Sequence, residues 1–181
     1  STADSVNKPE AISLLAGESF VSVSAGYLMS AAVSSSGEVW TWGNSDQSQL
    51  GRDSGGGDTG TPGRVEDGQG GYLNGVVDID VSGDVSVALK SNGEVWTWGA
   101  RSYLGQGIVS TDQIVPGQVS ISDVTHIAVG KSSDEEVHTL ALDSNGEVWA
   151  WGANVDRELG TNSGGTKHTP NKVQQVDGQG N

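Results

Sequence analysis

The stretch Gly37-Glu-Val-Trp-Thr-Trp-Gly43 returns unchanged at residues 93–99 and, with Ala in place of Thr, at residues 146–152. Side chains two positions apart on a strand point to the same side, so each copy presents two indoles on one face. We predict that these indoles form the structural core between neighbouring sheets; a row that stacks sugar rings or bases is the alternative. All six tryptophans of the chain lie in these copies: Trp40, Trp42, Trp96, Trp98, Trp149 and Trp151.

Prolines mark the same period independently. The four prolines stand at Pro9, Pro62, Pro116 and Pro170, with spacings of 53, 54 and 54 residues. Internal repeats of this length predict a solenoid or a propeller. We therefore treat residues 1–181 as a single array, counted from the prolines. The repeats cover residues 9–61, 62–115 and 116–169, and residues 170–181 are expected to start an unfinished fourth repeat.

Each repeat is expected to contain short strands. Val77, Ile79 and Val81 alternate with aspartates, which is the period of a half-buried strand. Asn92-Gly93 and Asn145-Gly146 then stand between apolar runs and predict two-residue hairpins in which both residues have positive φ. About four strands per repeat is the content of one propeller blade. The predicted fold class is all-β, with three propeller-type blades of about four antiparallel strands each and an incomplete propeller in one chain.

Further motifs recur in fixed order around the tryptophans. Ala-Leu-x-x-x-Gly precedes Val-Trp-x-Trp-Gly at residues 88–93 and 141–146, and Leu-Gly follows at residues 50–51, 104–105 and 159–160. This pattern resembles the regulator of chromosome condensation repeat. The resemblance implies one β-propeller blade per repeat, in a family whose closed rings usually have seven blades. Its best-known activity, nucleotide exchange on a nuclear GTPase with nucleosome binding, would need a complete ring and basic contacts to DNA; other relatives are binding propellers.

Composition excludes several classes of partner. The chain has 23 acidic and 9 basic residues and a formal net charge of −14, which repels phosphate backbones, so we expect no nucleic acid partner. No apolar run approaches the length of about 18 residues that crosses a membrane, so we expect no membrane insertion. The start at Ser1 fits a processed secreted protein and a trimmed chain equally well. We expect an extracellular or cell-surface protein.

Catalytic and metal-binding patterns are missing from the sequence. The three histidines stand at no recognised ligand spacing, and the chain has no cysteine. Neither a Gly-x-Ser-x-Gly elbow nor a phosphate-binding Gly-Lys-Ser/Thr loop occurs. We therefore predict a protein that is not an enzyme and has no cofactor. Calcium in the acidic loops around Asp53, Asp58 and residues 134–136 is the one cofactor left open.

Two hypotheses for function follow from this array. The first is a secreted structural protein that assembles head to tail with other copies of itself, as a ring or a filament, because one chain completes the unfinished blade of the next. The motivating observation is the surplus proline segment at residues 170–176. The residues of this candidate assembly strand are Ile12, Leu14, Leu15, Phe20, Val21, Val23, Val173 and Val176.

The alternative is a module, or a fragment of a larger propeller, that binds another protein through its variable loops. Loops that vary on a regular scaffold are where binding usually resides. Arg101, Ser102 and Tyr103 replace the polar run that precedes Leu-Gly in the other copies. We predict Arg101 and Tyr103 as the loop contacts.

Overall fold

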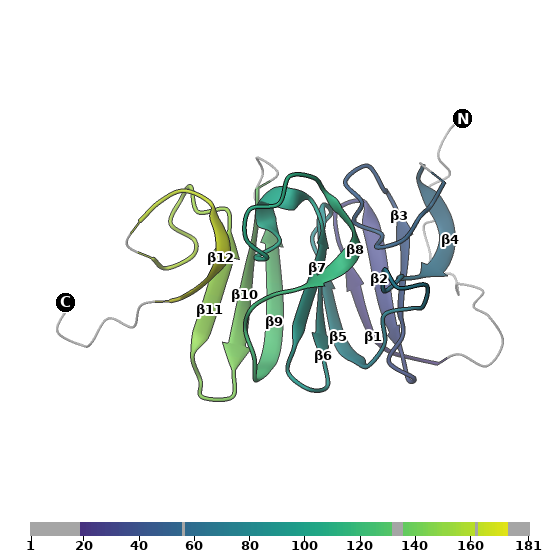
Figure 1. The fold of residues 1–181 in the computed structure, drawn as a ribbon, viewed down its shortest axis with the longest axis horizontal. Helices are drawn as coiled ribbons and strands as arrows, with labels where there is room; N and C mark the ends of the chain where they lie inside the picture. The colour runs from purple at the N-terminus through teal and green to yellow at the C-terminus, as the bar shows by residue number, and fades with distance from the viewer. Residues whose placement is uncertain (1–18, 56, 132–135, 162, 174–181) are drawn as a thin grey trace, which may run out of the picture.

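The computed structural model describes residues 19–55, 57–131, 136–161 and 163–173. In these residues, twelve strands form three antiparallel sheets of four strands each, placed in a row (Figure 1). This arrangement confirms the predicted all-β fold of three unclosed blades. Figure 1 labels the strands of blade 1 as β1 (Phe20–Ala25), β2 (Met29–Ser34), β3 (Val39–Gly43) and β4 (Thr59–Arg64).

The second and third blades repeat the order of the first. Blade 2 contains β5 (Val76–Val81), β6 (Val85–Lys90), β7 (Val95–Gly99) and β8 (Gln113–Gln118), with the short 3-10 helix η1 (Arg101–Tyr103) after β7. Blade 3 contains β9 (Val124–Lys131), β10 (Val137–Asp143), β11 (Val148–Gly152) and β12 (Lys167–Lys172). Among the described residues, no helix is long and apolar enough to cross a membrane.

The predicted hairpins form, although their turn differs from the expectation. Gly93 and Gly146 have φ of 81°, whereas neither Asn92 nor Asn145 is among the residues with positive φ. The Gly93 N–H donates to the Lys90 carbonyl over 2.9 Å, which closes a turn of four residues. Only the glycine takes the left-handed conformation, because a longer hairpin loop built on an ordinary turn needs it at one position.

The proline-containing strands are the last strands of their blades. Pro62, Pro116 and Pro170 lie in β4, β8 and β12, and each of these strands pairs with the tryptophan strand of its own sheet. Repeats counted from the prolines are therefore out of phase with the blades. Pro170 closes the third blade instead of starting a fourth unit. The proline in excess of the described blades is Pro9, which lies outside the described residues.

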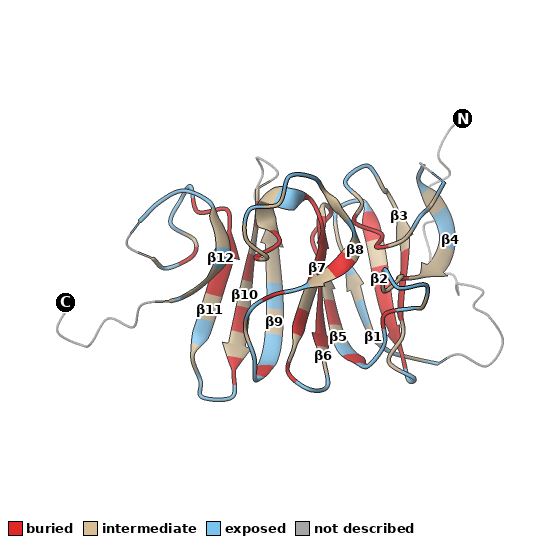
Figure 2. Cartoon of the chain, viewed as in Figure 1, coloured by how far each residue is buried: buried red, intermediate tan, exposed pale blue. Residues whose placement is uncertain are grey.

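Two apolar clusters hold the three blades together. One contains Met29, Val33 and Leu50 of blade 1 together with Ile79 and Trp98 of blade 2. The other joins blades 2 and 3 in the same way and includes Trp151. Trp98 and Trp151 are fully buried, and Figure 2 shows buried residues along β6 and β7 of the middle blade. Packing between the blades thus buries the large indoles of Trp98 and Trp151.

A glycine gives each buried indole its space. A Cβ atom at Gly51 would lie 2.6 Å from Trp98 Nε1, and one at Gly105 would lie 2.7 Å from Trp151 Nε1. Both glycines belong to the repeated Leu-Gly motif and have positive φ, of 68° and 74°. The Trp98 indole also donates to the Gln49 carbonyl over 2.8 Å. The Leu-Gly motif of one blade therefore serves as the seat for the tryptophan of the next.

Replacing Gly51 by alanine should destabilise the protein more than replacing Gly75 does. Gly75 has a similar φ of 71°, but a Cβ atom there meets nothing within 4 Å among the described residues. Both substitutions place an alanine in the left-handed backbone conformation, which costs roughly 1–2 kcal/mol. In Gly51→Ala, overpacking against the Trp98 indole adds about 1–3 kcal/mol. Urea unfolding of both variants measures the difference in the free energy of unfolding. Equal losses of stability in the two variants would contradict the role of Gly51 as the seat of Trp98.

Candidate functional site

The loops that join β1 to β2, β3 to β4, β5 to β6 and β7 to β8 all emerge at one end of the blades, because antiparallel strands alternate in direction. We call this end the rim. The loop between β7 and β8, residues 100–112, contains η1. The rim is therefore where loops from neighbouring blades can form one surface.

Hydrogen bonds to the tryptophan strand shape the loop that contains η1. The Thr97 hydroxyl donates to the Leu104 carbonyl over 2.7 Å, and the Gln106 amide donates to the Thr97 carbonyl over 2.7 Å. Thr41 makes the matching bond to the Leu50 carbonyl in blade 1, over 2.6 Å. The threonine of Trp-Thr-Trp thus anchors the Leu-Gly end of each of these loops. Arg101–Tyr103, which directly precede Leu104, form a single helical turn at the surface.

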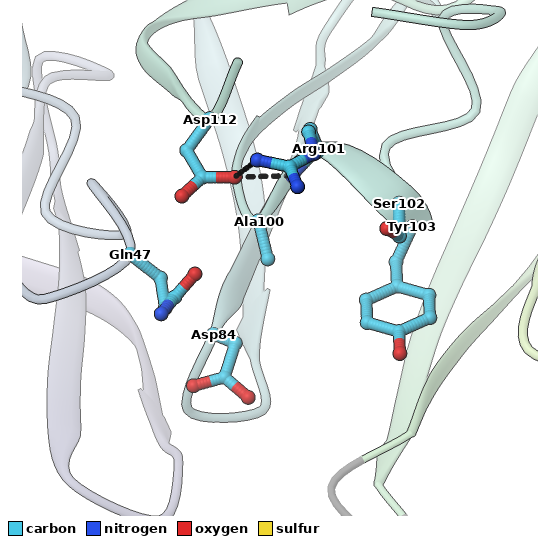
Figure 3. A pocket seen from close by; sticks show the side chains of 7 residues that line it. All are labelled: Gln47, Asp84, Ala100, Arg101, Ser102, Tyr103 and Asp112. Carbon is cyan, nitrogen blue, oxygen red and sulfur yellow. Dashed lines mark hydrogen bonds and ion pairs between the residues drawn. The ribbon is translucent and has the colours of Figure 1, made fainter. Parts of the chain in front are cut away.

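A pocket of about 310 Å³ opens beside η1, between blades 1 and 2. The Arg101 backbone N–H donates to Asp112 Oδ1 over 3.0 Å, and the Arg101 guanidinium Nη1 lies 3.9 Å from the same oxygen. Figure 3 shows this pair on one side of the pocket, with the Tyr103 ring apart from it. The Arg101 side chain remains 56% exposed. The lining residues are Gln47, Asp84, Ala100, Arg101, Ser102, Tyr103 and Asp112.

Asp84 connects this pocket to the other two blades. Its Oδ2 atom lies 3.1 Å from Lys131 Nζ, and Lys131 belongs to β9 of blade 3. The same ammonium lies 5.1 Å from the centre of the Tyr27 ring, which stands in the turn between β1 and β2 of blade 1. A cation held between a carboxylate and an aromatic face is attracted by both. Lys131 thus links side chains of all three blades at the rim.

The phenol of Tyr103 is less acidic than usual. Burial is the largest cause of its raised pKa, and the negative charges of Glu136 and Asp84 raise the pKa further. Tyr103 is partly buried against the cluster between blades 2 and 3, which anchors η1 to the propeller. Its polar end is therefore a neutral hydrogen-bonding group at neutral pH.

The structure brings Arg101 and Tyr103 together on η1 and adds residues that the sequence did not single out. Gln47 comes from the loop between β3 and β4 and Asp84 from the turn between β5 and β6, whereas Asp112 ends the loop that contains η1; the pocket depends on their meeting. The sequence signal that could have found them is their place in loops that leave the same end of the blades. Within the described residues, no group of three or more His, Asp or Glu side chains could hold a metal ion. Calcium binding stays an untested expectation.

The candidate assembly residues are separated in the structure. Phe20, Val21 and Val23 lie in β1, which pairs with β2 of its own blade, and Val173 follows β12. In the structure, β1 therefore belongs to the sheet of its own blade. The assembly hypothesis had assigned it to the unfinished blade of a neighbouring copy. The remaining candidates, Ile12, Leu14, Leu15 and Val176, lie outside the described residues.

Two family models, both described as the regulator of chromosome condensation (RCC1) repeat, match the chain. One matches residues 36–89, and the other matches residues 20–49 and 137–157. Together they cover about half of the chain. The matched residues lie in all three blades, so the match agrees with the observed architecture.

Similar proteins cover almost the whole chain. The E3 ubiquitin-protein ligase HERC2 of Homo sapiens is 33% identical over 183 residues, which is 95% of this chain and 4% of the ligase. The ultraviolet-B receptor UVR8 of Arabidopsis thaliana is 32% identical over 86% of this chain and 34% of the receptor. The crystal structure of human WBSCR16 aligns with a TM-score of 0.75 at 25% identity, over 90% of this chain and 42% of that one. The chain thus spans less than half of each of these relatives.

The stability of the protein should depend on Tyr103 at alkaline pH. A raised pKa means that the folded protein holds the phenolic proton more tightly than the unfolded chain does. The contribution of Tyr103 is therefore complete below its unfolded pKa, near 10, and is lost as the pH rises through the folded pKa. Urea unfolding should show a steeper alkaline loss for the wild type than for Tyr103→Phe.

Asp84→Asn is the matched variant for this prediction. It removes one of the two charges that raise the pKa of Tyr103, so its alkaline loss should fall between those of the wild type and Tyr103→Phe. Identical pH profiles for the wild type and Tyr103→Phe would contradict the assignment.

Proposed function

Because the chain belongs to the regulator of chromosome condensation (RCC1) repeat family, we propose that it is a protein-binding propeller module that contacts its partner through the rim. The observation that supports this most directly is the pocket beside η1, where an exposed arginine and a tyrosine stand next to two carboxylates. Arginine and tyrosine are enriched among the residues that dominate protein–protein binding energy.

The loop after η1 extends the proposed contact surface. Ile108 is 89% exposed, and Tyr27 on the neighbouring turn is 72% exposed. Exposed apolar side chains on the same rim as an arginine and a tyrosine provide the mixed surface that protein interfaces use. The formal net charge of −14 favours a partner with a basic surface, since long-range attraction speeds the encounter of opposite charges.

The activities in the names of the relatives are not carried over. HERC2 is named as an E3 ubiquitin-protein ligase and UVR8 as an ultraviolet-B receptor, and this chain spans 4% and 34% of their lengths. The shared part is the array of repeats. We therefore propose binding for this chain and neither ligase nor receptor activity.

The secreted self-assembling role has less support. Its motivation was a surplus proline strand at residues 170–176 that could complete a neighbour's blade. In the structure, β12 contains Pro170 and pairs with β11 of its own sheet, with Trp149 opposite Lys172 and Ala150 opposite Asn171. That strand is already in use, so we do not propose assembly by strand completion.

A photo-crosslinking amino acid at position 108 should capture the partner of the rim. Asn92, exposed in the hairpin between β6 and β7 at the opposite end of the blade, is the matched position. A partner crosslinked from position 108 and absent from position 92 is then purified. Arg101→Ala should weaken its binding at least about tenfold, measured by calorimetry, as expected for a residue at the centre of an interface.

Asn92→Ala serves as the control and should leave the affinity unchanged. The proposal would be overturned by the same crosslinked proteins at both positions. Unchanged affinity in both Arg101→Ala and Tyr103→Ala would overturn it as well. Urea unfolding of each variant checks that a lost affinity does not come from a lost fold.

A further inference from the structure

Both contacts between blades follow the same rule. The second indole of a Trp-x-Trp pair covers the Leu-Gly glycine of the preceding blade, as Trp98 does at Gly51 and Trp151 does at Gly105. Both glycines are buried under these indoles. Each blade therefore has an indole on one face, which we call the head face, and a glycine seat on the other, the tail face.

A backbone hydrogen bond accompanies each indole. We call the first strand of each blade, β1, β5 or β9, its inner strand. The backbone N–H of the first residue of an inner strand donates to the carbonyl of the hairpin glycine in the preceding blade: Val76 donates to Gly37 and Val124 donates to Gly93, each over 3.1 Å. A Cβ atom at Gly37 or Gly93 would lie 3.1 Å or 3.0 Å from the segment that enters the next blade. The same two contacts, at opposite ends of the blade, thus define both interfaces.

The tail face of blade 3 has the same features without an occupant among the described residues. Gly160, the third Leu-Gly glycine, is exposed, and a Cβ atom there meets only Val173. Val148 is 36% exposed, whereas its equivalents Val39 and Val95 are fully buried. The pale blue start of β11 in Figure 2 marks this difference.

The hairpin end of this tail face is also open. A Cβ atom at Gly146, the equivalent of Gly37 and Gly93, meets nothing within 4 Å among the described residues. A pocket of about 460 Å³ lies there, and its lining residues are Asn145, Gly146, Glu147, Val148, Lys172 and Val173. The first residue of an incoming inner strand occupies the equivalent place in the two internal interfaces.

The head face of blade 1 shows the complementary half. Trp42 pairs with Ser30 as Trp98 pairs with Ser86, so the two indoles are equivalent, yet Trp42 is partly exposed. Val23 is 75% exposed, whereas Ile79, its equivalent in blade 2, is 2% exposed. Among the residues that the structure describes, an indole without a seat is thus found at one end of the array, and a seat without an indole at the other.

We propose that a second copy of this chain docks its blade 1 on the tail face of blade 3. Trp42 of the second copy covers Gly160, and the backbone N–H of Phe20 donates to the Gly146 carbonyl. The second copy is the occupant that the structure supports, because its head face has the indole and the inner strand of the two existing interfaces. This contact packs whole faces together and needs no exchange of strands.

A head-to-tail contact joins two different surfaces, so its halves can be disabled separately. Val23→Asp places a charge on the head face alone, and Val148→Asp places one on the tail face alone. Both positions are exposed in one chain, so folding should survive. Because each variant retains one intact half, a mixture of the two can form a single contact.

Sedimentation and light scattering of the full chain over a wide concentration range test the proposal. The wild type should exceed the mass of one chain, 18.6 kDa, at high concentration. Each variant alone should remain at that mass, with an association constant at least about tenfold weaker. An equimolar mixture of the two should recover a species of two chains. Trp42→Ala should behave as Val23→Asp does.

Val77→Ser is the control, since Val77 is 49% exposed on β5 of the middle blade and belongs to neither the head face of blade 1 nor the tail face of blade 3. It should associate as the wild type does. The proposal is overturned if the wild type stays at one chain at all concentrations, as it would if a segment of the same chain filled the seat. It is also overturned if either charged variant associates like the wild type or if the mixture forms no dimer. Circular dichroism and urea unfolding confirm that each variant is folded.

Discussion

The contact on which the structure depends is an indole packed against a glycine of the neighbouring blade. A four-stranded sheet with two apolar faces is unstable alone, because both faces must be buried against another element. At Gly51 and Gly105 the lack of a side chain lets a tryptophan approach the backbone, and the apolar residues around it complete a cluster. Regular stacking of the blades follows from repeating this single contact.

Stacking also creates the candidate site. The rim pocket is assembled from Gln47 of blade 1 and from Asp84, Asp112 and η1 of blade 2, so it exists only when two blades pack in register. Lys131 of blade 3 then pairs with Asp84 across the next interface. The tryptophans and Leu-Gly glycines that hold the blades together thus determine the geometry of a pocket that they do not line. Variation in the loops can change the partner without disturbing the core.

Some of the site was predictable and some was not. Arg101 and Tyr103 stood out because they interrupt a pattern that the other repeats share, and comparison within one sequence is enough to detect that. Asp84 and Asp112 carried no such signal, because acidic residues are common throughout the chain. Asp112 is important because its own loop folds back onto the Arg101 backbone, and Asp84 because it lies beside Lys131 of another blade. The second distance is set by how the blades pack, which no local pattern encodes.

The sequence by itself determined the number of Trp-x-Trp blades and the strand content of each, because spacing of apolar residues and turn signals are local properties. It did not determine where a blade ends. The proline strand pairs with the tryptophan strand before it, and only the sheet shows that Pro170 completes blade 3. Three equivalent tryptophans also became different in the folded chain. Trp98 and Trp151 are buried and Trp42 is partly exposed, because burial depends on whether a neighbouring blade supplies the glycine seat.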